Sequence, residues 1–471
     1  MLKRCLRCFL VACTVCIFII PFSAIAASDE NLGLMREDID EISNRLDKVE
    51  TKSILDRVII GGEFRTRLDY LRYEDTTDSL DSTTPAPEHD ANTEDLWSNR
   101  LRLNLKANIT DDLIFQGRLS VFKLWGESNY YKPSFDLTYP SRPDSEGKVH
   151  LERAYIEYFI PDSHLALSVG RLPTNEGPPN EFRDNTTRKA NYPRLFIDGE
   201  SDGIVANISL DEWTDLKNSA LRLHYMKFIQ NALQDKGVDA DDSRVGIVSF
   251  ESEVPNIKNS FMWIGFLKIF DLPTVESFGS DSTISSLSGL LPITSTPKDG
   301  GHGELYSIHL QFDDINESGL DCFASFALIS IHPRSRGTVF GGGIYEAGIF
   351  GDNINGNLGD DQDGTCTYLG LRYTISSDAF NDPKVGFEYS HGSKYWMGLL
   401  SNGSGDLINK LNIGGDAYEI YYIQPIIEKH MFCRLGGVYM DYDYDISVPV
   451  GSIPDSDMTI FNGYLLMDVR F

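Results

Sequence analysis

From residue 57 onward, apolar and polar residues alternate along the chain with a period of two. In residues 60–70 the charged positions are Glu63, Arg65, Arg67 and Asp69, and the positions between them are uncharged. Residues 100–107, RLRLNLKA, repeat the alternation. Successive side chains of a β-strand point to opposite faces of its sheet, so this pattern predicts strands with one apolar and one polar face.

Sixteen segments of the chain carry this alternation. Their connections alternate between short turns, such as 110–112, and long polar loops, such as 73–95 and 173–200. An even number of strands joined in this way is typical of an outer-membrane barrel. We predict strands over 57–72, 96–109, 112–126, 148–160, 163–172, 201–211, 217–232, 242–253, 256–271, 303–313, 319–332, 364–376, 383–394, 415–427, 429–442 and 459–471.

The width of this ring decides which solvent each face meets. A soluble barrel fills its interior with apolar side chains, and sixteen strands enclose too wide a space for that. The apolar face must then meet lipid and the polar face water, and the sheet must close because lipid offers backbone groups no hydrogen-bond partner. The predicted fold class is all-β, a transmembrane antiparallel up-and-down β-barrel of about sixteen strands preceded by a short α-helical coiled coil.

Residues 32–49 carry the one convincing helical pattern. This run covers fewer than three heptads, and short helices rarely persist without packing, so we expect it to self-associate as a small coiled coil. Packing on the surface of its own chain is the alternative. The seam consists of Leu32, Met35, Ile39, Ile42, Leu46 and Val49.

The first 26 residues have the parts of a secretory signal peptide. Lys3, Arg4 and Arg7 precede the apolar run 8–20, and cleavage is expected after Ala26. An uncleaved membrane anchor and a lipoprotein box ending at Cys13 are the alternatives. The predicted division is a signal peptide (1–26), a coiled-coil helix with its linker (27–55) and an outer-membrane barrel (56–471).

The net charge of −28, which becomes −31 without the three basic residues of the signal peptide, argues against nucleic acid as a partner. Binding there depends on Lys and Arg that neutralise phosphates. After the signal peptide only Cys322, Cys366 and Cys433 remain, more than forty residues apart, so no metal-ligand pair is visible and the pairing of one disulfide stays open. We find no catalytic constellation and predict no enzyme activity, cofactor or metal.

The chain ends on Phe471, at a position where soluble chains usually fray. Leu465, Met467 and Val469 alternate before it, which resembles the signal recognised by the outer-membrane assembly machinery. With the stretches WSNRLRLNLKANITDDLIFQGRLSVFKLWGE, RAYIEYF and VGRLPTNEGPPNEFRDN, the chain resembles the bacterial outer-membrane porins, most nearly uncharacterised ones with a short coiled coil before the barrel. The resemblance implies a homotrimeric channel for passive diffusion of ions and small hydrophilic solutes, in contact with outer-membrane lipid and lipopolysaccharide.

The resemblance also implies that the third long loop, 173–200, folds into the barrel and narrows it. Its acids, with Asp202 just beyond, would form the constriction: Glu176, Glu181, Asp184, Asp198, Glu200 and Asp202. By alternation, a basic wall would face them across the lumen: Arg65, Arg67, Arg100, Arg102 and Arg118.

Opposed charges would create a field across the water-filled pore. The alternative is that these arginines pair with wall acids such as Glu63 and Asp69 and only stabilise the wall. The overall acidity favours a weak preference for cations. Besides a channel, a structural barrel that tethers the envelope or sheathes a periplasmic partner remains open, as does a barrel enzyme, because fold alone does not choose among them.

Overall fold

The computed structural model describes residues 41–42, 57–75, 89–125, 146–229, 242–271, 293–295, 301–333, 335–339, 344–347, 361–398, 406–444 and 455–471. The chain divides into two compact units, Met1–Val58 and Ile59–Phe471. Of the predicted coiled-coil seam, only Ile42 is described, in a helical pair with Glu41, so the coiled coil and the signal peptide lie outside the described residues.

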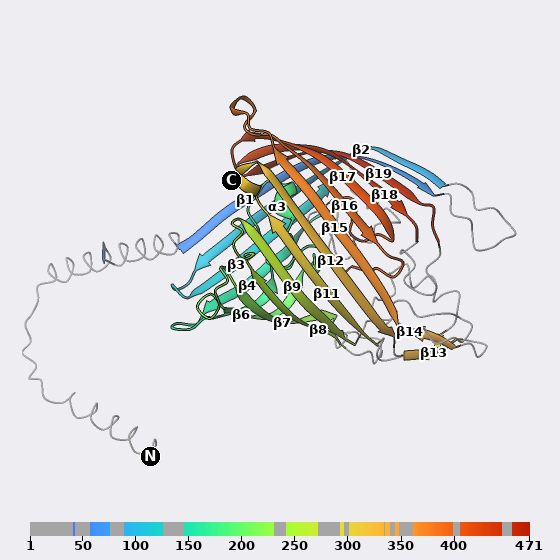
Figure 1. Cartoon of the computed structure of the whole chain (residues 1–471), viewed down its shortest axis with the longest axis horizontal. Helices are drawn as coiled ribbons and strands as arrows, with labels where there is room; N and C mark the ends of the chain where they lie inside the picture. The colour runs from blue at the N-terminus through green and yellow to red at the C-terminus, as the bar shows by residue number, and fades with distance from the viewer. Residues whose placement is uncertain are drawn as a thin grey trace, which may run out of the picture. The chain divides into compact units, whose positions relative to one another are not determined.

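Sixteen antiparallel strands close into a ring, which confirms the predicted barrel. Each strand pairs with the next along the chain, apart from the separate strands β10, β13 and β14, and β19 returns to β1. Figure 1 shows the strands running obliquely around the ring. They are β1 (Val58–Asp75), β2 (His89–Asn108), β3 (Leu113–Leu124), β4 (Glu146–Phe159), β5 (Leu165–Leu172), β6 (Ser201–Ser209), β7 (Ala220–Ile229), β8 (Ser243–Ser252), β9 (Ser260–Phe270), β11 (Gly301–Phe312), β12 (Leu320–Pro333), β15 (Gln362–Thr374), β16 (Lys384–Gly392), β17 (Gly415–Ile427), β18 (Met431–Tyr442) and β19 (Thr459–Arg470).

Short connections lie at one end of the barrel, which we call the turn end, and long ones at the other, the loop end. Two of the short connections contain single turns of 3-10 helix, Ile315–Glu317 and Asp378–Phe380. The segments between β9 and β15 contribute a separate three-stranded sheet of β10 (Ile293–Ser295), β13 (Ser335–Val339) and β14 (Ile344–Ala347), which the alternation did not predict. Short turns therefore alternate with long loops, as an up-and-down barrel requires.

The ring closes at the C-terminus, where β19 pairs with β1 in register from Arg470 opposite Glu63 to Thr459 opposite Glu74. Beyond the strand, the backbones of Gly62 and Phe471 exchange two hydrogen bonds, of 2.6 and 3.0 Å. A side chain at Gly62 would meet the Phe471 ring at 2.4 Å, so glycine is needed for the ring to lie there. The terminal phenylalanine is thus fixed at the seam instead of fraying.

The apolar face of the strands points outward. Leu103, Ile264 and Leu435 are 43, 51 and 58% exposed, and Leu465 and Phe471 of the predicted assembly signal lie on the same outer surface. Residues of the other parity, such as Arg102 and Glu419, are buried in the lumen. A soluble barrel would have the reverse arrangement. Within the described residues, no helix is long and apolar enough to cross a membrane.

The lumen face is less uniform than the alternation predicted. On β1–β4 it carries arginines and glutamates, but on β8–β15 it carries Val245, Ile247, Trp263, Leu267 and Ile329, all nearly fully buried. The expectation that the inner face is polar throughout is therefore wrong for this half of the ring. Apolar residues are stable there because chain inserted from the loop end covers them.

Candidate functional site in the barrel lumen

Residues 173–200, which we call the inserted loop, occupy the lumen. Glu176 contacts Arg118 of β3, Glu181 contacts Gln311 of β11, and Arg183 contacts Glu419 of β17. These strands lie on different sides of the ring, so the loop reaches their inner faces only from within. The inserted loop includes the short helix α3 (Asn180–Asp184), all of whose residues are buried.

Glu176 anchors the inserted loop to the basic wall. Its carboxylate oxygens accept hydrogen bonds from Arg102 and Arg118, and a guanidinium nitrogen of Arg153 lies 3.5 Å away. A side chain at Gly177 would lie 1.7 Å from the carbonyl oxygen of Tyr192, so only glycine allows this close folding of the loop on itself. Burial would raise the pKa of Glu176, but the surrounding cations, Arg102 above all, hold that pKa well below its usual range.

A second anchor lies at the C-terminal end of α3. The Asp184 carboxylate lies 3.2 Å from Arg65 and 3.3 Å from Arg434. The last carbonyl groups of the helix, which have no partner within it, accept hydrogen bonds from Arg372, Arg434 and Arg470, with the first two at 2.9 and 2.7 Å. Cations at a helix C-terminus also interact favourably with the negative end of the helix dipole. Burial alone would raise the pKa of Asp184, and Arg65 and Arg434 instead hold it well below normal.

The segment 406–414 is the second piece of chain in the lumen. Asp406 lies 2.7 Å from Arg67 and 2.9 Å from Arg183, while Lys410 forms ion pairs with Glu388 and Glu419. Despite its burial, the Asp406 carboxyl keeps a pKa well below normal, because Arg183 and Arg67 stabilise its charge. A cavity of about 10 Å³ lies between this segment, the inserted loop and the wall, which is the space of a single water molecule at most.

The other side of the inserted loop is apolar. Phe196 packs against Trp263 with ring centroids 4.7 Å apart, and Phe182 lies near Phe323 at 6.0 Å. Leu195 and Phe196 are completely buried in this cluster, together with lumen residues of β7–β15. The inserted loop therefore lies between a charged wall and an apolar wall.

Four predicted constriction acids lie on the inserted loop inside the lumen. Besides Glu176 and Asp184, these are Glu181, which accepts a hydrogen bond from Gln311 at 3.0 Å, and Asp198, which pairs with Arg194 at 3.0 Å and accepts the Glu176 backbone N–H at 2.9 Å. Burial is the main cause that raises the pKa of both Glu181 and Asp198. These two acids thus face other groups of the lining and not open solvent.

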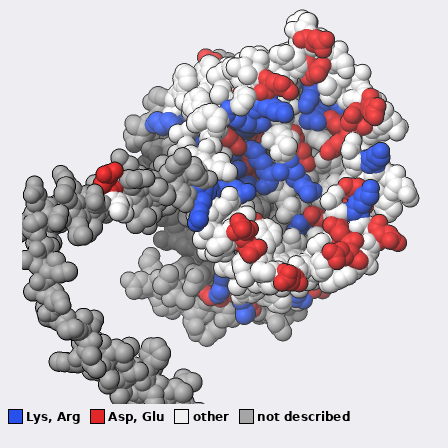
Figure 2. All heavy atoms as spheres, turned by 90° about the vertical axis from the view of Figure 1, so that its left-hand side faces the viewer, with Lys and Arg blue, Asp and Glu red and all other residues white. Residues whose placement is uncertain are grey.

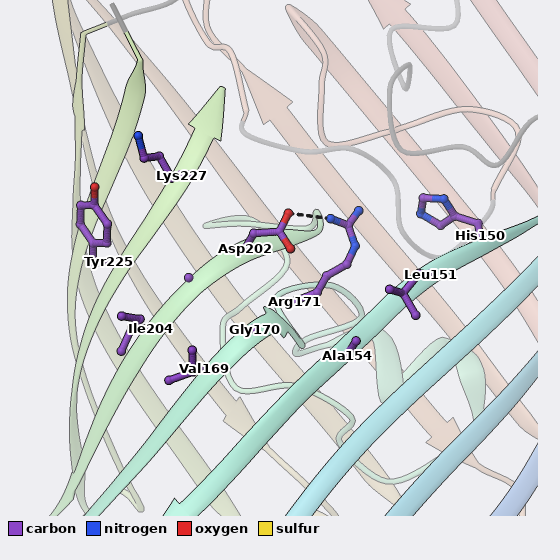
Figure 3. A pocket seen from close by; sticks show the side chains of 11 residues that line it. His150, Leu151, Ala154, Val169, Gly170, Arg171, Asp202, Ile204, Tyr225 and Lys227 are labelled. Carbon is purple, nitrogen blue, oxygen red and sulfur yellow. Dashed lines mark hydrogen bonds and ion pairs between the residues drawn. The ribbon is translucent and has the colours of Figure 1, made fainter. Parts of the chain in front are cut away.

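The other two predicted acids, Glu200 at the end of the inserted loop and Asp202 on β6, pair with Arg171 and not with the wall arginines. Asp202 shares the outward parity of Ile204 on β6 and pairs with Arg171 at 2.8 Å, its side chain 63% exposed. Figure 3 shows this pair beside Val169 and Ile204, in a hollow of the outer surface. Glu200 bridges the same Arg171 and His150, with its carboxylate 2.6 Å from the His150 ring nitrogen. The prediction that Asp202 belongs to the constriction is therefore wrong, because its side chain lies on the outer surface.

The five predicted wall arginines are buried in the lumen: Arg65, Arg67, Arg100, Arg102 and Arg118. Both kinds of pairing weighed from the sequence occur. Arg102 and Arg118 bind the inserted loop, whereas Arg67 lies 2.8 Å from the wall acid Asp69, and Arg100 lies 3.9 Å from Glu63. Figure 2, a view onto the turn end, shows Lys and Arg gathered around the centre and acids towards the rim.

Sequence reasoning missed Arg153, Arg183, Asp406, Lys410 and Arg434. Alternation would have placed Arg434 in the lumen, because it shares the inward parity of its strand. Arg153 has the parity of the outward-facing Leu151, but a register shift between β3 and β4 at this point leaves both Glu152 and Arg153 buried. Arg183, Asp406 and Lys410 lie in connections, where no periodicity exists. Within the described part of the chain, no cluster of His, Cys, Asp or Glu is arranged to hold a metal ion, and Cys322, Cys366 and Cys433 are free thiols.

These features define a closed sixteen-stranded β-barrel, apolar outside, whose third long connection is held within the lumen. The chain belongs to the family described as "Protein of unknown function (DUF3373)", whose model matches residues 90–460. No curated protein sequence matches the chain.

Three solved structures are similar to this chain at low sequence identity. OprB of Pseudomonas putida is 12% identical with a TM-score of 0.48, over 89% of this chain and 96% of that one. The outer membrane channel DcaP of Acinetobacter baumannii is 12% identical with a TM-score of 0.44, over 88 and 97%. The trimer form of OmpT, an outer membrane protein of Vibrio cholerae, is 10% identical with a TM-score of 0.41, over 88 and 99%.

Proposed function

We propose that this chain forms a water-filled channel in the outer membrane, through which ions and small hydrophilic solutes diffuse passively, and that the inserted loop narrows it. The observation that carries this proposal is the inserted loop itself, anchored by ion pairs within a closed ring whose outer face is apolar. A barrel that exposes leucines around its outside is stable only in a lipid environment. An N-terminal signal peptide would deliver it there.

The constriction proposed here consists of Glu176 and Asp184 facing Arg65, Arg102 and Arg118. These groups are in direct contact, so their ion pairs fix the inserted loop where it narrows the lumen, and charged groups beside the remaining aqueous path filter ions by sign. Because Glu176 and Asp184 are each held by at least two arginines, the inserted loop would act as a fixed restriction and not as a freely moving gate. Asp202 is left out of this constriction since it lies on the outer surface.

Assembly follows from the same outer surface. We propose that Leu465, Met467, Val469 and Phe471 are read by the outer-membrane assembly machinery before β19 closes on β1. We also propose a homotrimer in a membrane of lipid and lipopolysaccharide. Cross-linking of the purified protein tests the trimer, and a Phe471→Ala variant that still reaches the outer membrane in normal amounts would contradict the role of the terminal residue.

A structural barrel without conductance is the second candidate, and one observation favours it. The cavity between the inserted loop and the 406–414 segment has room for about one water molecule, and two apolar clusters lie on the lumen side of the ring. An enzyme has less support. Ser325 lies 2.7 Å from a ring nitrogen of His309, but that imidazole is completely buried near Phe261 and Phe323, so a substrate has no access to it.

Planar-bilayer recording of the purified, folded protein separates the two candidates. A channel gives discrete conductance steps in KCl, whereas a structural barrel gives none although circular dichroism shows β-structure and the protein resists mild detergent. Conductance steps establish the channel. Their absence from a folded preparation favours the structural barrel and contradicts the proposal.

A further inference from the structure

A pocket of about 210 Å³ lies on the inner face of β1–β4, towards the turn end. Its polar lining comes from Asn104, Lys106, Gln116, Arg118 and Arg153, and Gly61 and Gly117 contribute backbone. No carboxylate belongs to the lining. The pocket therefore combines three cationic side chains with amide groups, which is the donor set that binds an oxyanion.

The cations of this pocket belong to a larger network of ion pairs. The carboxylates of Glu63, Glu152 and Glu176 form ion pairs with five cations of this region: Arg100, Arg102, Arg118, Arg153 and Lys189. Lys106 adds a positive charge, and Glu157, which accepts a hydrogen bond from Gln116 at 3.3 Å, adds a negative one. Lys106, Arg118 and Arg153 thus line a pocket whose own lining contains no carboxylate.

Some hydrogen-bond donors of the pocket are available to a ligand. The Arg153 side chain is 10% exposed, and its Nε has no hydrogen-bond partner among the described groups. The Asn104 side-chain oxygen accepts a hydrogen bond from Arg118 at 2.7 Å, which leaves its amide nitrogen as a donor. Lys106 forms no ion pair within the part of the chain that the structure describes and is exposed to the lumen. A buried donor without a hydrogen-bond partner is costly, and a bound anion would satisfy it.

We propose that this pocket binds an oxyanion group, a carboxylate or a phosphate, carried by a small solute that enters the lumen from the turn end. The inference rests on the proposed channel, because the solute reaches the pocket through the aqueous lumen. Lys106 attracts the anion at the mouth of the pocket, while Arg153 and Asn104 supply hydrogen bonds at its base. Figure 2 shows the matching concentration of basic side chains around the centre of the turn end.

The pocket predicts selectivity opposite to that expected from the whole chain. The net charge of −28 is carried in part by exposed acids on turns and loops, whereas permeating ions experience the lumen. Wild-type protein should therefore prefer chloride to potassium in a KCl gradient. Inorganic phosphate and acetate should bind and reduce the chloride current.

The test uses Lys106→Gln and Lys106→Glu, because Lys106 anchors no part of the inserted loop. Lys258→Gln is the matched control, since Lys258 is an exposed lysine on the turn between β8 and β9 at the same end of the barrel. Isothermal titration with inorganic phosphate, and separately with acetate, should show binding about tenfold weaker in Lys106→Gln, and binding abolished in Lys106→Glu. Lys258→Gln should bind both ions as the wild type does.

The proposed anion binding is contradicted if the wild type binds neither phosphate nor acetate, or if binding is unchanged in both Lys106 variants. The two proposals fail separately. If the protein binds phosphate but gives no conductance steps, the anion site is supported and the channel is contradicted. If the protein conducts with a preference for potassium and binds neither phosphate nor acetate, the channel is supported and the anion site is contradicted. Binding of phosphate without acetate, or the reverse, decides which oxyanion group the pocket takes.

Discussion

The inserted loop lies between two walls that hold it by different physics. On β1–β4 the wall is basic, and its contacts are ion pairs such as those of Glu176 with Arg102 and Arg118. On β8–β15 the wall is apolar, and its contacts are ring packing such as that of Phe196 on Trp263. The basic wall fixes the loop through a few directional contacts, while the apolar wall adds stability through buried area. A constriction needs both, because charges alone would leave the loop free on its other side.

The largest effect is expected from the basic wall. Glu176→Gln leaves Arg102, Arg118 and Arg153 without the carboxylate that they share. Loss of one partner from a buried ion-pair network costs about 3–5 kcal/mol, so the inserted loop should detach from this wall. Limited proteolysis should then cleave within residues 173–200. Asp162→Asn, on an exposed turn, is the control. Unchanged resistance of Glu176→Gln would show that the ion pairs do not hold the loop.

The apolar wall should give the next effect. Phe196→Ala removes a completely buried ring from its contact with Trp263 and should lower the free energy of unfolding by about 3 kcal/mol through lost packing and a cavity. Denaturant unfolding followed by tryptophan fluorescence measures this change. The matched control is Phe461→Ala, which removes an outward-facing ring of β19. A loss of less than about 1 kcal/mol in Phe196→Ala would mean that the apolar wall contributes little.

The next smaller effect should come from lowering the pH, which weakens the ion pairs of the basic wall but not the packing of the apolar wall. The pKa values of Glu176, Asp184 and Asp406 are held below normal, so their stabilisation is complete above the ordinary carboxyl pKa of about 4 and is lost as the pH falls through the lower folded values. Glu181 and Asp198 have raised pKa values and act in the opposite direction, because the folded state takes up their protons first.

Proteolytic resistance of residues 173–200 should therefore persist, or rise slightly, from pH 7 down to about 4, and fall only in stronger acid. Unfolding midpoints and protease digestion with an acid-active protease, measured over this range, check the profile. Release of the loop between pH 7 and 5 would contradict it, since it would require carboxylates with raised pKa values at the anchors. Phe196→Ala should shift the whole profile without changing its shape.

The smallest effect is expected outside both walls. Asp202→Asn removes one partner of an exposed ion pair on the outer surface, and such pairs contribute about 0–1 kcal/mol. The free energy of unfolding and the reversal potential should both stay close to those of the wild type. A clear change in ion selectivity would return Asp202 to the constriction and contradict its outward placement.

The two walls also differ in how well the sequence predicted them. Alternation revealed the barrel strands and the arginines of the basic wall, because a charged residue at every second position can only face one side. Alternation did not predict the apolar wall, because strands such as β8 carry apolar residues on both faces. Val245 and Ile247 face the lumen, and Val248 faces outward. Periodicity cannot assign such positions, and what covers them is decided by chain from elsewhere in the sequence.

The candidate site was predictable only in part for the same reason. The resemblance to porins pointed to the loop 173–200, but the partners of its acids depend on contacts such as Asp184 with Arg434, about 250 residues apart. Asp406 and Lys410 carry no local signal, and only the folded ring brings them to Arg183 and Glu388. Asp202 was assigned inward because it follows the loop closely, although its parity on β6 places it outside.

The central claim is that the ion-paired inserted loop restricts passage through the lumen. Single-channel conductance of the double variant Glu176→Gln/Asp184→Asn, compared with the wild type in the same salt, tests it most directly. The account predicts a larger and noisier conductance in the variant, because both anchors to the basic wall are weakened. An unchanged conductance in a folded, correctly inserted variant would contradict it.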